Sequence, residues 1–171
     1  MALNIQDLMK QLRNWNNGSR NIAKEGWDTL SRLPRGKYIY SYLIGRYAPY
    51  TGSIKAVIEE LSTGHSEVVL KDTPNLRNHL QSIHAVALAN LAELTGNIAL
   101  SYSMPADARF IVSKMELEYV KKARGTVTGV CDCPVPTSNA KKTYLVPVRI
   151  VNDAGEVVCK ATLHSLVGPK K

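Results

Sequence analysis

Hydrophobic residues in the first part of the chain recur every three or four positions, which is the spacing of one helix face. Polar residues separate them, so the pattern predicts an amphipathic helix that packs on the rest of the domain, the alternative being a helix on a membrane surface. Trp27, Leu30 and Leu33 extend the helical pattern, and Pro34 and Gly36 end it. The apolar positions of the first helix are Ile5, Leu8, Met9, Leu12 and Trp15.

Five of the eight tyrosines fall between Tyr38 and Tyr50, in a run that ends near Gly52. This run predicts a helix that covers an apolar face. Tyrosines can also stack on nucleic-acid bases, but no nucleic-acid-binding motif accompanies these residues. We therefore predict no nucleic-acid partner.

Beyond Ser53 the hydrophobic period changes to alternation, which is typical of strands. Residues 54–59 and 67–71 flank the turn at Ser62 to Gly64 and predict a hairpin. No strand–helix–strand repeat occurs, so we predict an α+β fold in which this hairpin and a four-strand meander form an antiparallel sheet around one helix. The four strands of the meander are expected at residues 111–119, 126–133, 143–151 and 157–167.

The most apolar segment, residues 85–100, is Ala, Val and Leu on nearly every side and predicts the surrounded helix. It is shorter than the ~20 residues that a bilayer span needs. Glu93 is its only ionisable residue. Because burial of an unpaired carboxylate is costly, Glu93 must accept hydrogen bonds, become protonated or face a wet cleft, and both a structural and a functional role stay open.

A dense polar stretch from Arg77 to His84 leads into this helix. Ser82 is the predicted N-cap. Free backbone N–H groups in the first turn, around Ala85 and Val86, can then point at an oxyanion or a thioester oxygen.

His84 and Glu93 are nine residues apart, which puts them on opposite faces of a helix and about 13 Å apart along its axis. One copy of the helix cannot bring them together, whereas two antiparallel copies across a two-fold axis can. We therefore predict a homodimer or a homotetramer, with a sheet that continues across the two-fold axis.

Asn78, His84 and Glu93 stand at the spacing of a hallmark of the hotdog-fold thioesterases, in which Asn precedes His-Gly-Gly and an acidic residue follows. Over residues 49–167 the sequence resembles the branch of this superfamily related to the phenylacetic-acid-degradation thioesterases. The resemblance implies a single hotdog domain over residues 1–171, with N-terminal helices in residues 1–50 and the sheet wrapped around one central helix in residues 51–171.

The resemblance also implies what these residues do. Glu93 would be the general base or the nucleophile that attacks an acyl-CoA or acyl carrier protein thioester. The backbone N–H of Ala85 would polarise the thioester carbonyl, while Asn78 and His84 would place groups around it. Ala85 and Val86 stand in place of Gly-Gly, and the branched side chain of Val86 changes the shape of the pocket.

Two further interpretations depend on the same resemblance. Ser113, on the strand after the helix, could orient the carboxylate, or could be a plain strand serine. His79 and Glu93 have a separation similar to that in hotdog dehydratases, but the Pro- and Gly-rich link of those enzymes is absent, which disfavours dehydration. A non-catalytic acyl-CoA or lipid binder is the alternative to a thioesterase.

Charge adds a possible binding surface. The chain has 22 Lys and Arg against 14 Asp and Glu, and its formal charge of +8 suits a polyanionic partner such as acyl-CoA, an acyl carrier protein or an anionic membrane. Lys121, Lys122 and Arg124 cluster beside a turn. We expect them to contact the CoA phosphates, the alternative being a solvated rim.

The three cysteines, Cys131, Cys133 and Cys159, are an odd number on strand-like segments, which predicts reduced core thiols in a reducing compartment. Cys131 and Cys133 lack further ligands at a zinc spacing, so no metal and no other cofactor is predicted. The N-terminus does not resemble a secretory signal, and we expect a cytoplasmic protein. The amphipathic, Arg-containing start leaves a mitochondrial location as the alternative.

Overall fold

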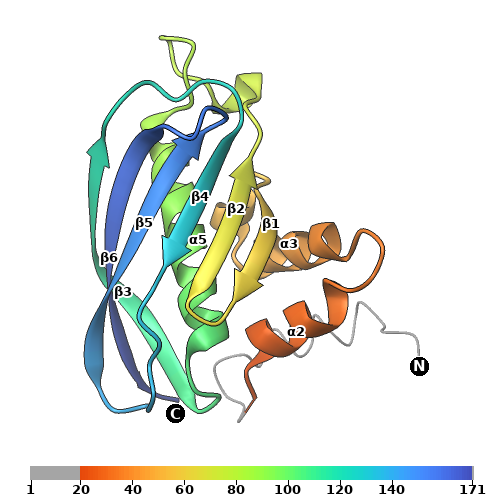
Figure 1. The fold of residues 1–171 in the computed structure, drawn as a ribbon, viewed down its shortest axis with the longest axis vertical. Coiled ribbons are helices and arrows are strands. Elements are labelled where there is room, and N and C mark those ends of the chain that lie inside the picture. The colour runs from red at the N-terminus through yellow and green to blue at the C-terminus, as the bar shows by residue number, and fades with distance from the viewer. Residues whose placement is uncertain (1–19, 171) are drawn as a thin grey trace.

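A computed structural model of the chain describes residues 20–170. Within these residues, three helices precede the sheet: α2 (Ile22–Leu30), α3 (Gly36–Tyr47) and the single turn α4 (Pro49–Gly52) (Figure 1). The second and third of these confirm the helix predicted for the tyrosine-rich run. The amphipathic helix predicted from residues 5–15 lies outside the described residues.

Six strands form one antiparallel sheet with the spatial order β1-β2-β4-β5-β6-β3. The hairpin predicted around residues 62–64 is confirmed by the first two strands, which turn at Gly64 with a φ of 77°. The strand bounds are β1 (Val57–Ser62), β2 (His65–Leu70), β3 (Ala108–Tyr119), β4 (Val127–Asp132), β5 (Lys142–Asn152) and β6 (Val157–Pro169).

The predicted four-strand meander is wrong in one strand. β4, β5 and β6 are consecutive neighbours, but β3 pairs with β6, with Ala108 opposite Pro169 and Tyr119 opposite Cys159. Alternation of polar and apolar residues reports which face of a strand is buried, and it carries no information on which neighbour the strand joins. β3 is consequently an edge strand of the sheet.

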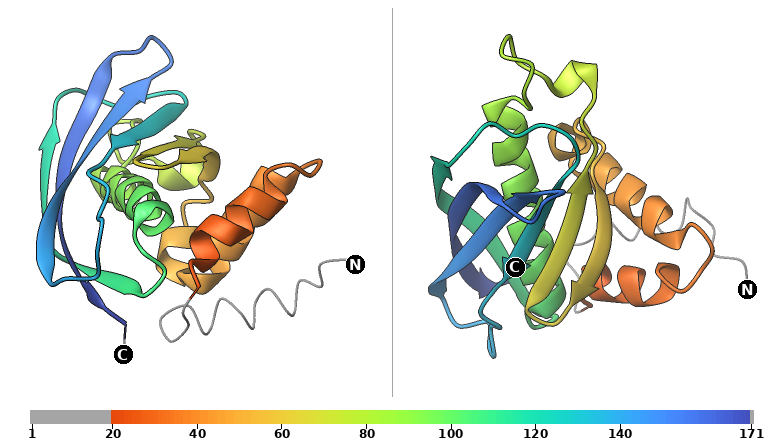
Figure 2. Two further views of the ribbon diagram at one scale, coloured as in Figure 1. Left: turned by 60° about the horizontal axis from the view of Figure 1, so that its bottom comes forward. Right: turned by 45° about the horizontal axis from the view of Figure 1, so that its top comes forward.

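The long helix α5 (Ala85–Ser103) lies in the concave face of the curved sheet and contacts all six strands (Figures 1 and 2). Leu91 and Leu100 on this helix are completely buried, as are Leu163 and Val146 on the facing strands. The prediction of a helix surrounded by the sheet is confirmed. None of the described helices is long and apolar enough to cross a membrane.

The N-terminal helices are tied to each other and to the first strand by specific contacts. The ring of Trp27 meets the ring of Tyr40 edge-on, with centroids 5.3 Å apart, and the Tyr40 hydroxyl donates to the carbonyl of Ala23 at 2.9 Å. Burial raises the pKa of Tyr40 above its ordinary value. On α3, the Ser41 hydroxyl accepts a hydrogen bond of 2.9 Å from the backbone N–H of Ile58 in β1, so this helix is fastened to the first strand.

Two glycines allow α5 to lie close against the sheet. A Cβ at Gly96 would overlap the side chain of Leu163 and would lie 3.1 Å from Cγ1 of Val146. A Cβ at Gly129, on β4, would overlap the hydroxyl of Thr95. The helix and the sheet therefore touch backbone to side chain at these two points.

We expect Gly129→Ala to lower the free energy of unfolding by about 1–3 kcal/mol, because its Cβ overpacks a contact that has no spare room. Gly168→Ala is the matched control, since Gly168 also lies on a strand and a Cβ added there would meet nothing within 4 Å beyond its chain neighbours. Urea denaturation followed by tryptophan fluorescence measures both variants. Equal stabilities would contradict the close contact at Gly129.

Candidate active site

The loop between β2 and α5 folds around the side chain of Asn78. It begins with the short helix η1 (Pro74–Leu76). The Asn78 Oδ1 accepts hydrogen bonds from the N–H of Leu80 at 2.9 Å and from the N–H and hydroxyl of Ser82 at 3.3 Å and 3.2 Å. Gln81 completes the turn with a left-handed φ of 55°. Since the oxygen of Asn78 is engaged, its Nδ2 is the group that can donate to a bound molecule.

His84 caps the start of α5. Its Nδ1 accepts a hydrogen bond of 3.1 Å from the N–H of Val86. The prediction of Ser82 as the N-cap is wrong, because the Ser82 hydroxyl is already donated to Asn78 inside the preceding turn. The N–H of Ala85 has no hydrogen-bond partner within residues 20–170. The helix therefore begins with one free donor, the N–H of Ala85. This N-terminal end of the helix also carries the partial positive charge of the helix dipole.

Glu93 lies more than two turns further along α5. Its side chain is half-buried and makes no hydrogen bond or ion pair with any described residue. It belongs to the less buried stripe of the helix, together with Val86, Ala89 and Asn97. Within one chain no contact joins Glu93 to His84, as the nine-residue spacing predicted.

Arg124 lies beside the loop that leads into α5, and its hydrogen bonds are to that loop. Its Nε and Nη2 donate to the carbonyls of Gln81 and Leu80, both at 3.3 Å. Arg77 donates at 2.8 Å to Asp72, and this hydrogen bond lowers the pKa of the Asp72 carboxyl from its ordinary value. An open cavity of about 660 Å³ is lined by Lys71, Asp72, Arg77, Gln81, Arg124, Gly125 and Thr126.

The remaining predicted residues are more scattered. Lys121 forms an ion pair of 3.0 Å with Glu156, whereas Lys122 is exposed and has no partner among the described residues. Ser113 lies at an irregularity in β3, where its hydroxyl donates to the carbonyl of His164 at 2.9 Å. In a single chain, Ser113 does not contact the carboxylate that it was expected to orient.

The sequence interpretation missed two asparagines on α5. The side-chain oxygens of Asn90 and Asn97 are buried and lack a hydrogen-bond partner within the described part of the chain, although the amide of Asn90 donates to the carbonyl of Tyr50 at 3.1 Å. They are seven residues apart, which places them on the same side of the helix. The sequence itself shows two asparagines at this spacing in a mostly apolar segment, so this pair can be found without the structure.

The cysteines are all buried and free, which confirms the prediction of core thiols. Among the described residues, the side chains close enough to share a metal ion are Glu60, His65 and Glu67, whose ligand atoms lie within 4.8 Å of one another. These three residues lie on β1 and β2, away from the start of α5.

Solved structures with a similar fold are known. A structural-genomics protein, APC5556, is 28% identical with a TM-score of 0.71, and the match covers 95% of this chain and 99% of that one. PA5026 from Pseudomonas aeruginosa, a protein of unknown function called a probable thioesterase, is 21% identical with a TM-score of 0.70, over 80% of this chain and 97% of that one.

A third solved structure holds a ligand. It is smu.793 from Streptococcus mutans bound to acetyl-CoA, which is 18% identical with a TM-score of 0.57, over 67% of this chain and 89% of that one. No curated protein matches the sequence. The family model that matches residues 36–167 is described as a domain of unknown function, DUF4442. Because this match spans most of the chain and the fold is that of hotdog thioesterases, the chain belongs to the DUF4442 family and has a hotdog fold.

Proposed function

We propose that the protein hydrolyses acyl-CoA or acyl carrier protein thioesters. The observation that carries this proposal is the unpaired N–H of Ala85, within the described residues, at the start of a helix of 19 residues. A backbone donor at this position, reinforced by the helix dipole, suits the negative charge that develops on a thioester oxygen. His84 supports this proposal because its Nδ1 accepts a hydrogen bond from the N–H of Val86, which fixes the orientation of the first turn of the helix.

In the reaction we propose, Glu93 acts as the general base. Its carboxylate removes a proton from water, and the water oxygen forms a bond to the thioester carbonyl carbon. The carbonyl oxygen becomes negative and accepts the hydrogen bond from Ala85, while the Nδ2 of Asn78 is a second donor near the substrate. The carbon–sulfur bond then breaks and the thiolate takes the proton from Glu93. If Glu93 instead attacks directly, its oxygen bonds to the carbonyl carbon, the carbon–sulfur bond breaks to release the thiolate, and water then hydrolyses the acyl-enzyme anhydride.

Several observations support a thioester of CoA as the substrate. The related fold of smu.793 binds acetyl-CoA, and PA5026 is called a probable thioesterase. In this chain, three cations, Lys71, Arg77 and Arg124, line one open cavity together with a single carboxylate, that of Asp72, which pairs with Arg77. Their charges suit the CoA phosphates, and Lys122 adds a cation without an ion-pair partner in the described part of the chain.

We also propose that the active unit is a homodimer, or a homotetramer built from it. β3 pairs with a neighbour along one edge only within the described residues, and Ile111 on this strand is 66% exposed. Two β3 strands paired across a two-fold axis would continue the sheet and bring the two α5 helices together. Glu93 of one copy would then face Ala85 of the other.

A cytoplasmic location fits the same chemistry. Cys131, Cys133 and Cys159 are free, and their burial suits proteins that fold in a reducing compartment. We propose that the protein binds its thioester substrate in the cytoplasm.

A non-catalytic acyl-CoA binder is the second candidate. The observation that favours it is Val86, whose branched side chain is 52% exposed beside the donor where related thioesterases are expected to have glycine. Release of free thiol from a panel of acyl-CoAs, measured alongside binding of the same compounds, separates the two functions. Tight binding without thiol release would identify the protein as a binder.

Glu93→Gln is expected to lower turnover at least ~100-fold, because it removes the base while keeping size and hydrogen-bonding capacity. Melting temperature and dimerisation should stay unchanged, since Glu93 makes no hydrogen bond within the described chain. Glu67→Gln is the control for loss of a half-buried carboxylate elsewhere, as Glu67 is also half-buried and lies on β2. A Glu93→Gln variant with full activity would rule out the proposed base.

A mixing experiment tests the shared site. Glu93→Gln and Asn78→Ala should each be inactive alone, and light scattering should give at least twice 18.8 kDa for both. After the two are unfolded and refolded together, activity should return to about a quarter of wild type, because half of the dimers are mixed and each of those has one intact site. No recovery from two folded, dimeric variants would place both residues in a site within one chain.

Lys122→Glu is expected to raise KM for acyl-CoA more than it lowers kcat, because the charge acts on the bound phosphates and not on the reacting carbonyl. The effect should shrink as salt is added. Lys142→Glu is the control, since Lys142 begins β5 opposite Val167, whereas Tyr119, close to Lys122 in the chain, pairs with Cys159 near the other end of β6. An unchanged KM at every salt concentration would show that Lys122 is only solvated.

A further inference from the structure

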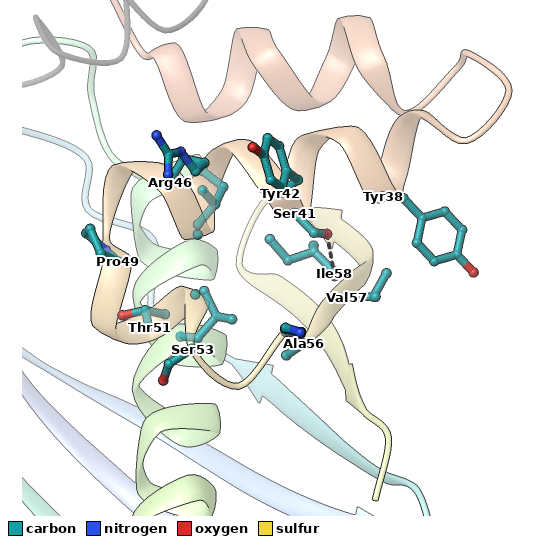
Figure 3. Close-up of a pocket in the computed structure, with 15 residues that line it drawn as sticks. Tyr38, Ser41, Tyr42, Arg46, Pro49, Thr51, Ser53, Ala56, Val57 and Ile58 are labelled. Atoms are coloured by element: carbon teal, nitrogen blue, oxygen red, sulfur yellow. Dashed lines mark hydrogen bonds between the residues drawn. The ribbon is translucent and has the colours of Figure 1, made fainter. Parts of the chain in front are cut away.

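A cavity separate from the proposed active site lies between α3, α4 and the segment that leads into β1 (Figure 3). Its volume is about 500 Å³, within the range of clefts that hold small molecules. Leu94 of α5 contributes to its lining, as do Ser53 and Ala56 from the segment before β1 (Figure 3).

The inner part of this cavity is apolar. Ile44, Ile58 and Leu94 are each less than a tenth exposed and line it. The two serine hydroxyls in the lining are already engaged, since Ser41 donates to the Lys37 carbonyl at 2.7 Å and Ser53 donates to the Tyr50 carbonyl at 2.6 Å. Because these hydroxyls are satisfied, the part of a molecule that enters should be hydrocarbon.

The outer part of the cavity is cationic. Arg46 and Lys55 are both exposed, line the cavity and make no ion pair with any described residue. None of the described acidic residues lines the cavity, while the exposed phenols of Tyr38 and Tyr42 add two groups that can donate hydrogen bonds. This rim favours an anion over a cation or a neutral group.

Lys55 also has an unusual backbone. Its φ is 54°, in the left-handed region that a residue with a side chain occupies at a cost of about 1 kcal/mol. Gly52 precedes it by three residues, so glycine is used elsewhere in this short connection but not at the strained position. A strained lysine at the rim of a cavity is consistent with a side chain held there for its charge.

We propose that this cavity binds a fatty carboxylate, with the hydrocarbon chain between α3 and α5 and the carboxylate against Arg46 and Lys55. The chemistry required is a single apolar chain that ends in one negative charge. A free fatty acid has this chemistry, whereas the acyl chain of a CoA thioester ends in a neutral group. Binding is measured without turnover, so its result does not depend on whether the protein hydrolyses thioesters.

Isothermal titration calorimetry of the full chain with decanoate, below its micellar concentration, tests the site. One decanoate should bind per chain. Decanol should bind at least about tenfold more weakly because it lacks the charge, and decyltrimethylammonium should not bind. The S-decyl thioether of CoA, whose chain ends at a neutral sulfur, should not displace decanoate, and displacement would show that the cavity does not require a charge at the end of the chain.

Lys55→Gly separates charge from structure. It removes the cation and relieves the left-handed backbone, so the melting temperature should hold or rise while decanoate affinity falls about tenfold. Arg35→Gly is the matched control, since Arg35 is also an exposed cation with a positive φ, of 59°, but does not line the cavity. It should bind decanoate like the wild type.

A second pair of variants tests the location of the chain. Thr51→Phe fills the cavity and should abolish binding, whereas Thr128→Phe, at a half-buried position on β4 outside it, should not. Failure of the wild type to bind decanoate at millimolar concentration would overturn the proposal. So would equal binding of decyltrimethylammonium, or equal loss of affinity in Lys55→Gly and Arg35→Gly.

Discussion

The packing of α5 against the concave face of the sheet is the contact on which the rest of the molecule depends. The helix touches every strand, and at Gly96 and Gly129 it does so without room for a methyl group. Such close packing prevents the helix from sliding along its axis and from rotating about it. A residue on α5 therefore has a defined position relative to each strand, which is what a catalytic group placed on a helix requires.

The same packing explains why the candidate site is split along the helix. Most of the circumference of α5 is occupied by the sheet and by α4, which leaves the stripe with Val86 and Glu93 as the accessible side. The helix start, by contrast, is shaped by a loop whose groups bond to each other around Asn78. In the proposed dimer, the donor of one copy and the carboxylate of the other would lie face to face.

The sequence predicted the elements of this fold better than their connections. The hairpin, the central helix and the three later strands of the sheet follow from hydrophobic period, which is a local property. The position of β3 next to β6 depends on contacts far apart in the chain, and no local pattern contains it. The same limit applies to the candidate site. The spacing of Asn78, His84 and Glu93 can be seen in the sequence. The hydrogen bonds of Ser82 and Arg124 depend on which groups the fold places beside them, and the sequence alone does not contain that information.

The bond between Ser41 and Ile58 has a consequence for how far the sheet can grow. β1 and β3 are the two outer strands, and an outer strand with unpaired backbone groups invites further strands. On β1, α3 lies alongside and its serine occupies an N–H that another strand would use. Within the described residues, β3 thus remains the edge open to pairing. In the proposed dimer, in which two β3 strands pair, the continuous sheet would therefore end on both sides at a β1 strand covered by α3.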